Sequence, residues 1–86
     1  MSDDKPAIPY DLARRAVIPF GKYKGQTLDM ISTHVDGSPD LEGLKYLDWL
    51  VGEYKWFKEH CSDLYDHVVA FLEDSAVKAD LEEALA

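Results

Sequence analysis

The chain has 86 residues, a formal net charge of −8, 47% hydrophobic residues and 30% charged residues. A chain of this length forms one domain with one modest core, burying roughly 60–65% of the surface that its unfolded form exposes. No apolar run approaches the ~18–20 residues that cross a bilayer, so the composition excludes a membrane-spanning protein. Because no apolar segment follows the charged N-terminus and the lone Cys61 cannot form an internal disulfide, we expect a cytoplasmic location.

Charge is distributed unevenly along the chain. Residues 1–24 carry five basic and three acidic side chains, a balance of +2, while residues 25–86 carry four basic and fourteen acidic ones, a balance of −10. Lysine and arginine supply most of the affinity for a phosphate backbone, so any contact with DNA should be local to the basic segment. The acidic remainder suits basic partners, including the DNA-binding grooves of other proteins.

The N-terminal third predicts the only β-structure in the chain. Residues 1–7 are polar and are expected to be a disordered lead, and Pro9 at a first helical position would start one or two helical turns over 10–16. Residues 17–20 are then predicted to form a short strand, which Pro19 confines to the edge of a sheet. Residues 26–27 are predicted to form the second strand of the hairpin. The expected fold class is therefore α+β and predominantly helical, with one short two-stranded hairpin at about 17–27 packed on three to four helices.

The tip of this hairpin is the Gly-Lys-Tyr-Lys-Gly run at 21–25. Gly21 and Gly25 are expected at the two ends of a tight turn because glycine permits positive φ. Thr27 should cap a helix over 28–34, and a helix start beside two lysines can hold phosphate or carboxylate. The alternative is a turn whose lysines only keep it hydrated. The residues expected to bind phosphate or a partner are Arg14, Arg15, Lys22, Tyr23, Lys24 and Thr27.

The same run carries a resemblance to a known family. Residues 19–28, Pro-Phe-Gly-Lys-Tyr-Lys-Gly-Gln-Thr-Leu, resemble the Pro-Phe-Gly-Lys-x-Lys-Gly-x-x-Leu motif of small domains at the C-terminus of exonuclease-X-like proteins and in a family described as quorum-sensing-regulated virulence factors. That family continues with Tyr-Leu-x-Trp-Leu, and residues 46–50 read Tyr-Leu-Asp-Trp-Leu. The resemblance covers residues 18–57, with 33–43 as an insertion-like segment, and implies a role in DNA processing without implying a reaction.

Two apolar stripes predict the helices that form the core. Leu44, Leu47 and Val51 have helical spacing over 41–51, between an Asp-Gly-Ser-Pro loop at 36–39 and Gly52. From 56 to 72 a second stripe occupies about one third of a helical wheel, which fits one helix, either continuous or broken near Ser62, which would then cap the second part. The second stripe consists of Phe57, Cys61, Leu64, Val68, Phe71 and Leu72.

Burial and domain limits follow from these stripes. Trp49, Phe57, Leu64 and Phe71 are expected among the buried residues, although helical geometry puts Tyr46 and Trp49 away from the first stripe. The single domain should span 8–74. The alanine-rich tail, 75–86, is either a short final helix or a frayed end.

Candidate catalytic chemistry is sparse. His60, Asp63 and His67 would share one edge of a helix, but zinc sites usually draw ligands from two elements, so a polar rim is the simpler interpretation. Cys61 falls in the apolar stripe and should be a small buried hydrophobe. A P-loop is excluded because three residues, not four, separate Gly21 and Gly25. We therefore expect a non-catalytic protein with no metal or cofactor.

Two specific hypotheses and a general one remain. The first is a small binding module of DNA metabolism, whose lysine turn engages phosphate or a partner protein. The second is a phage-type DNA mimic, whose acidic side chains occupy the DNA-binding surface of a host DNA-processing protein. The third is an acidic protein with an unrelated interaction. The acidic residues of the second hypothesis are Asp29, Asp36, Asp40, Glu42, Asp48, Glu53 and Glu59.

Overall fold

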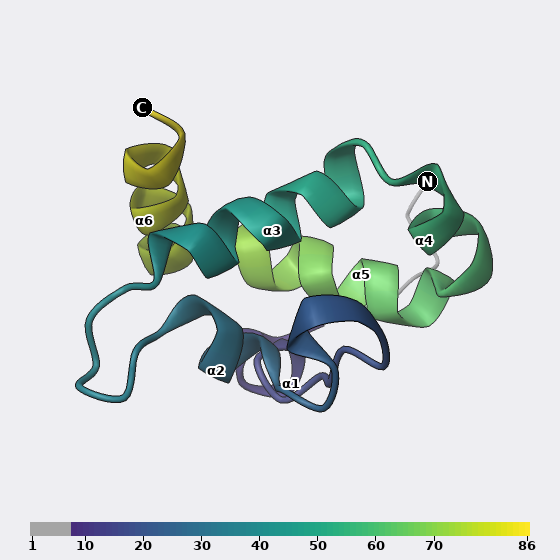
Figure 1. Cartoon of the computed structure of the whole chain (residues 1–86), viewed down its shortest axis with the longest axis horizontal. Helices are drawn as coiled ribbons and strands as arrows, with labels where there is room; N and C mark the ends of the chain where they lie inside the picture. The colour runs from purple at the N-terminus through teal and green to yellow at the C-terminus, as the bar shows by residue number, and fades with distance from the viewer. Residues whose placement is uncertain (1–7) are drawn as a thin grey trace.

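The computed structural model describes residues 8–86, so the lead expected at 1–7 lies outside the described part. Six α-helices and one short 3-10 turn make up the regular structure of this part (Figure 1). None of the described helices has both the length and the apolar composition needed to cross a membrane. The elements are α1 (Tyr10–Ala13), η1 (Gly21–Tyr23), α2 (Leu28–Ser32), α3 (Leu41–Gly52), α4 (Lys55–His60), α5 (Ser62–Leu72) and α6 (Ser75–Leu85).

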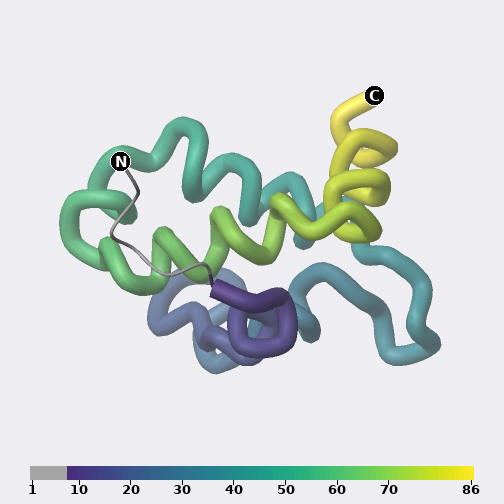
Figure 2. Tube along the Cα trace, turned by 180° about the vertical axis from the view of Figure 1, so that it is seen from behind, coloured from purple at the N-terminus to yellow at the C-terminus, as the bar shows by residue number. Residues whose placement is uncertain are grey.

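Helices α3 and α5 form the centre of the molecule and run side by side (Figure 1). Short α4 reverses the chain between them at one end, and α6 packs across α3 at the other. Helix α2 contacts α3, while α1 contacts α5, as the view from behind also shows (Figure 2). The N-terminal segments thus close one side of an α3–α5 pair.

The predicted hairpin is wrong, because no strand occurs in residues 8–86. Only an isolated antiparallel bridge joins Val17 to Thr27. Inside it, the Ile18 amide donates to the Gln26 carbonyl (3.0 Å) and the Gly25 amide donates to the Ile18 carbonyl (2.8 Å). Pro19 has no amide proton to extend a ladder, and the chain coils into η1 instead of continuing as a strand. The regular secondary structure of the described residues is therefore helical, and the fold is not α+β.

Helix boundaries differ from the expected ones where a cap was misplaced. Pro9 is the N-cap of α1 rather than its first residue, and α1 ends after four residues. The break in the 56–72 helix falls at Cys61, whose backbone (φ −132°, ψ 53°) is not helical, so Cys61 and not Ser62 is the N-cap of α5. Thr27 is confirmed as the α2 cap, because its hydroxyl accepts from the Met30 amide at 3.1 Å.

Helix α3 begins where the expected loop ends. The Ser38 amide and hydroxyl donate to Asp36 Oδ1 at 3.0 and 2.7 Å, and the backbone bond is the main reason that the pKa of Asp36 is lowered. Asp40 then caps α3 by accepting from the Gly43 amide at 3.1 Å. Helix α2 approaches α3 closely at Gly43. A Cβ at this position would overlap the Ile31 carbonyl.

The core confirms two of the four expected buried residues. Phe57 and Phe71 are fully buried, but Leu64 is only half-buried and Trp49 is 43% exposed. Trp49 lies outside the stripe that α3 turns toward the core, where Leu50 is buried and Val51 only partly so. The tail is a helix rather than a frayed end, because Asp74 caps α6. Its buried residues are Val77, Leu81 and Ala84.

Candidate functional site

The lysine turn, residues 21–25, is a compact coil fixed by its two glycines. Gly21 has φ +74° and Gly25 has φ +86°, as expected for turn glycines. The Lys24 amide donates to the Gly21 carbonyl (3.2 Å), and the Gln26 amide donates to the Tyr23 carbonyl (3.0 Å). A Cβ at Gly21 would also stand 2.9 Å from the Tyr46 hydroxyl, whereas one at Gly25 would meet open space. Backbone geometry therefore holds both ends of the turn.

Tyr23 is the anchor of the lysine turn and does not lie at an exposed tip, contrary to the sequence-based expectation. Its side chain is 9% exposed, and its ring centroid lies 4.8 Å from that of Tyr46 on α3. Lys22 Nζ lies 5.4 Å from the Tyr23 centroid, within the range of a cation–π contact. Lys22 and Lys24 remain exposed. The burial of the tyrosine thus fixes the backbone from which both lysines extend.

A continuous series of rings runs from Tyr46 across the α3–α4 junction, and we call it the aromatic row. Trp49 stacks on Tyr54 (4.8 Å between centroids, 14° between planes), Tyr54 on Trp56 (5.8 Å, 29°), and Trp56 on His60 (4.8 Å, 15°). Tyr46 lies 6.0 Å from Trp49. The members are Tyr46, Trp49, Tyr54, Trp56 and His60.

The aromatic row is attached to the core by Phe20 but is open to solvent. Phe20 meets Trp56 and Phe57 edge-on, at 5.8 and 5.9 Å, just before the lysine turn. Trp49 and Trp56 are 43% and 44% exposed, and they are the only tryptophans in the chain. Burial, followed by the neighbouring Tyr23 and Tyr54, raises the pKa of Tyr46, so its hydroxyl stays neutral at physiological pH. The row joins the lysine turn through Tyr46.

Sequence reasoning did not identify the aromatic row as a site. The four aromatic residues between positions 46 and 56 were visible, but their contacts depend on the turn between α3 and α4. Three of the five row members come from α4 and the residue before it. A periodicity analysis of one long helix cannot show that these rings meet the rings of α3.

The arginines of the predicted site belong to a different surface. Arg14 Nε is shielded from solvent and lies 3.4 Å from Asp11 Oδ1 without a well-formed hydrogen bond, and Arg15 Nη2 lies 4.0 Å from Asp11 Oδ2. Arg15 lines a shallow pocket with residues of α5, whereas the lysine turn contacts Tyr46 of α3. The two halves of the predicted phosphate site are therefore supported by different helices.

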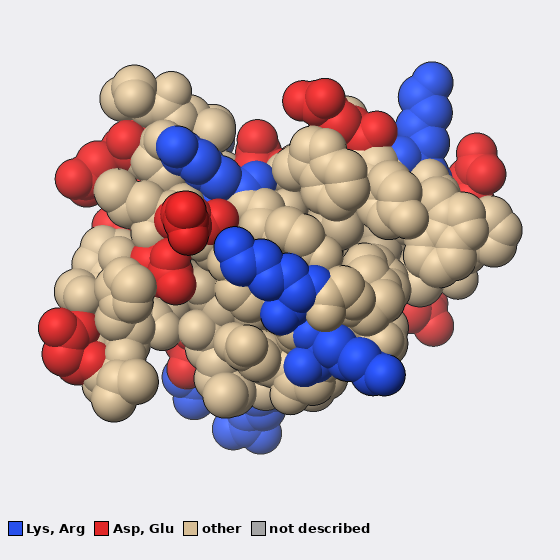
Figure 3. Space-filling model, in the orientation of Figure 1, with Lys and Arg blue, Asp and Glu red and all other residues tan. Residues whose placement is uncertain are grey.

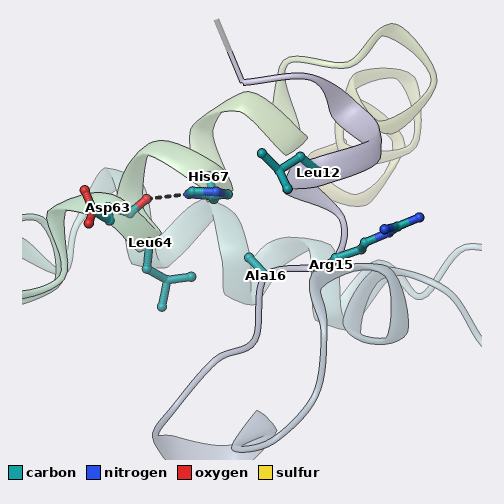
Figure 4. A pocket seen from close by; sticks show the side chains of 6 residues that line it. All are labelled: Leu12, Arg15, Ala16, Asp63, Leu64 and His67. Carbon is teal, nitrogen blue, oxygen red and sulfur yellow. Dashed lines mark hydrogen bonds between the residues drawn. The ribbon is translucent and has the colours of Figure 1, made fainter. Parts of the chain in front are cut away.

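The α1–α5 pocket has a volume of about 300 Å³ and mostly apolar walls (Figure 4). His67 Nδ1 lies 2.7 Å from the Asp63 carbonyl oxygen, so Nδ1 donates and Nε2 is the acceptor of the neutral ring. The Asp63 carboxylate points away from the imidazole. The lining residues are Leu12, Arg15, Ala16, Asp63, Leu64 and His67.

Metal binding finds no support in the arrangement of these side chains. The break at Cys61 separates His60 from Asp63 and His67, which the sequence analysis placed on one helix edge. His60 Nδ1 lies 3.1 Å from the Trp56 carbonyl and donates to it. Within residues 8–86, no three His, Cys, Asp or Glu side chains are grouped so as to hold a metal ion.

Acidic side chains of the mimic hypothesis are dispersed, and some have local roles. Asp36 and Asp40 accept hydrogen bonds that shape the loop and the start of α3. On the face shown in Figure 3, acidic side chains lie in several separate groups, with basic side chains between and beside them. The visible acids do not form one continuous strip.

Thr27 has a structural role at the start of α2. Its hydroxyl already accepts from the Met30 amide, and α2 has only five residues. Lys22 and Lys24, two other residues of the predicted phosphate site, are exposed.

Comparison with protein-family models, curated proteins and solved structures finds no match to this chain. The resemblance of residues 18–57 to the exonuclease-X-associated domains accordingly stays a prediction that rests on the motif itself.

Proposed function

We propose that this protein is a non-catalytic binding module of nucleic-acid metabolism that holds phosphate groups at the lysine turn. The observation that carries the proposal is the placement of two exposed lysines on a turn anchored by the Tyr23–Tyr46 contact. A fixed backbone reduces the freedom that each lysine loses on binding, which favours a localised contact. The link to DNA in particular rests on the motif resemblance.

The charge of the protein sets the strength expected of this contact. A net charge of −8 repels a polyanion at long range, so the lysine turn has to act at short range and at modest salt. Each phosphate neutralised on duplex DNA contributes about −0.9 to the slope of log affinity against log salt, and on a single strand about −0.7. Binding should therefore be weak and should weaken further as salt is raised.

A titration that follows intrinsic fluorescence tests the proposal, because both tryptophans lie in the aromatic row next to the turn. The Lys22→Ala/Lys24→Ala variant should bind DNA less tightly and show a salt slope smaller by about 1.4 to 1.8 than that of the original protein. Lys78→Ala, which removes an exposed lysine from α6, is the matched control and should leave both values unchanged. Equal binding by the double variant and the control would refute a role for the turn.

The DNA-mimic hypothesis is the alternative that the same titration separates. A mimic would leave the tryptophan signal unchanged on addition of DNA, yet would compete with DNA for a basic protein. That competition should weaken when Glu42, Glu53 and Glu59, which are exposed, are changed to glutamine. Loss of competition with these variants, together with no DNA binding, would replace the lysine turn with the acidic surface as the functional site.

A further inference from the structure

A second lysine pair adjoins the aromatic row at Tyr54. A pocket of about 200 Å³ opens at the α3–α4 junction, beside the backbone of residues 51–52. Lys58 Nζ lies 5.5 Å from the Tyr65 ring centroid at its wall, and Tyr54 belongs both to this wall and to the row. The residues that line the pocket are Val51, Gly52, Glu53, Tyr54, Lys55, Lys58 and Tyr65.

Lysines thus adjoin the aromatic row at two of its members, Tyr46 and Tyr54. Lys22 and Lys24 adjoin it through the Tyr23–Tyr46 contact, and Lys55 and Lys58 adjoin it through Tyr54. These are four of the eight Lys and Arg side chains in residues 8–86. An otherwise acidic protein therefore places half of its described basic side chains in the two regions that adjoin the aromatic row.

The exposed rings themselves have a regular geometry. Successive rings from Trp49 to His60 are inclined by only 14°, 29° and 15°, so their planes are close to parallel. Trp49 and Trp56 keep more than two fifths of their surface exposed, although Trp49 stacks on Tyr54 and Trp56 stacks on both Tyr54 and His60. Parallel aromatic planes extend a stack of unpaired bases, since every base has a π-face, and this stacking tolerates any sequence.

From this arrangement we infer that the ligand is single-stranded nucleic acid, whose bases stack on Trp49 and Trp56 while its phosphates lie at Lys22 and Lys24 and at the Lys55–Lys58 pocket. The inference rests on the proposed function and names its ligand. A duplex cannot use the row, because its bases are paired and stacked inside the helix. Aromatic rings combined with a cationic track are the arrangement by which many proteins bind single strands.

Fluorescence anisotropy of a labelled oligothymidylate of about twelve nucleotides tests the inference, with a duplex of equal length and an abasic strand of equal length as comparisons. The oligothymidylate should quench the tryptophan fluorescence and bind more tightly than either comparison. Trp56→Leu and Trp49→Leu should each weaken its binding about tenfold, because one stacked base is lost. Tyr10→Leu removes an exposed ring on α1, outside the row, and should leave binding unchanged.

A substitution at Glu53 should change oligothymidylate binding in the opposite direction. Glu53 lines the same pocket as Lys55 and Lys58, so Glu53→Gln, which removes a negative charge there, should tighten oligothymidylate binding, while Lys55→Ala/Lys58→Ala should weaken it. A thermal unfolding curve of each variant shows whether the fold is retained. The comparison of thymidylate with the abasic strand uses the unaltered protein, so it decides the matter even if a tryptophan variant does not fold.

The outcomes separate this inference from the proposed function. Lysine-dependent binding that is equal for oligothymidylate, duplex and abasic strand would overturn base stacking and leave the lysine turn as a phosphate site. Absence of binding to all three would overturn both. Stronger binding of oligothymidylate, lost with the tryptophans and not with Tyr10, supports both.

Discussion

At the scale of single residues, Tyr46 connects the features on which the account depends. Its ring packs on Tyr23, its hydroxyl stands against Gly21, and Trp49 follows one turn later on the same helix. The lysine turn and the aromatic row therefore share one side chain. A substitution at Tyr46 or at Gly21 should therefore affect both the lysine turn and the aromatic row.

Substitution of the turn glycines should separate backbone strain from side-chain contact. Gly25→Ala places a side chain at positive φ in open space and should cost about 1–2 kcal/mol of unfolding free energy. Gly21→Ala should cost more, because its Cβ also displaces the Tyr46 hydroxyl. Gly52→Ala, in helical backbone with open space around it, should stabilise by about 0.5–1 kcal/mol. Urea denaturation measures all three, and an equal cost at positions 21 and 25 would contradict the Tyr46 contact.

Tyr46 should also make stability depend on pH in the alkaline range. Burial raises its pKa above the ordinary value of 10.0, so the folded state holds the phenolic proton more tightly than the unfolded state does. This contribution is complete below the unfolded pKa and is lost as pH rises through the folded pKa. Denaturation should be measured at about pH 8 and about pH 11. The fall in the free energy of unfolding between these two pH values should be smaller for Tyr46→Phe than for the original protein. An equal fall in the free energy of unfolding for the two proteins would mean that Tyr46 is not the group whose titration lowers stability at alkaline pH.

At the scale of elements, the sequence predicts helices well where a cap and a stripe agree. Thr27 and the 41–51 stripe located α2 and α3, because an N-cap hydroxyl and a 3.6-residue period are local signals. The hairpin was wrong because Pro19 and two glycines at positive φ stop pairing after one bridge. The aromatic row was missed because it is assembled by the chain reversal at α4, which is a tertiary event.

The crossing of α2 and α3 at Gly43 provides an element-scale prediction. A Cβ at Gly43 would overlap the Ile31 carbonyl, which is backbone within a helix and cannot rotate aside. Gly43→Ala should therefore force α2 away from α3 and cost about 3 kcal/mol, although alanine favours helix. Thermal unfolding should show a clear fall in the midpoint. An unchanged or raised midpoint would mean that the two helices do not approach this closely.

At the scale of the whole molecule, a helical core of modest size supports two kinds of surface, one acidic and one that combines lysines with exposed aromatic rings. Acidic side chains outnumber basic ones in the chain, and the lysine turn, the aromatic row and the Lys55–Lys58 pocket adjoin one another across α3 and α4. Negative charge elsewhere suppresses non-specific contact with polyanions, so only a ligand that offers unpaired bases gains enough from the row to remain bound. For random duplex we expect affinity no better than the ~10⁻⁴–10⁻⁶ M of non-specific contacts.

The most direct test is the salt dependence of oligothymidylate binding, followed through the fluorescence of Trp49 and Trp56. Four lysine contacts to a single strand predict a slope of about −3 in log affinity against log salt, with quenching of the tryptophans at every salt concentration where binding occurs. An absence of quenching, or a slope near zero, would contradict the claim that the lysine turn and the aromatic row together hold a single strand. Sub-micromolar binding of random duplex at physiological salt would contradict it as well.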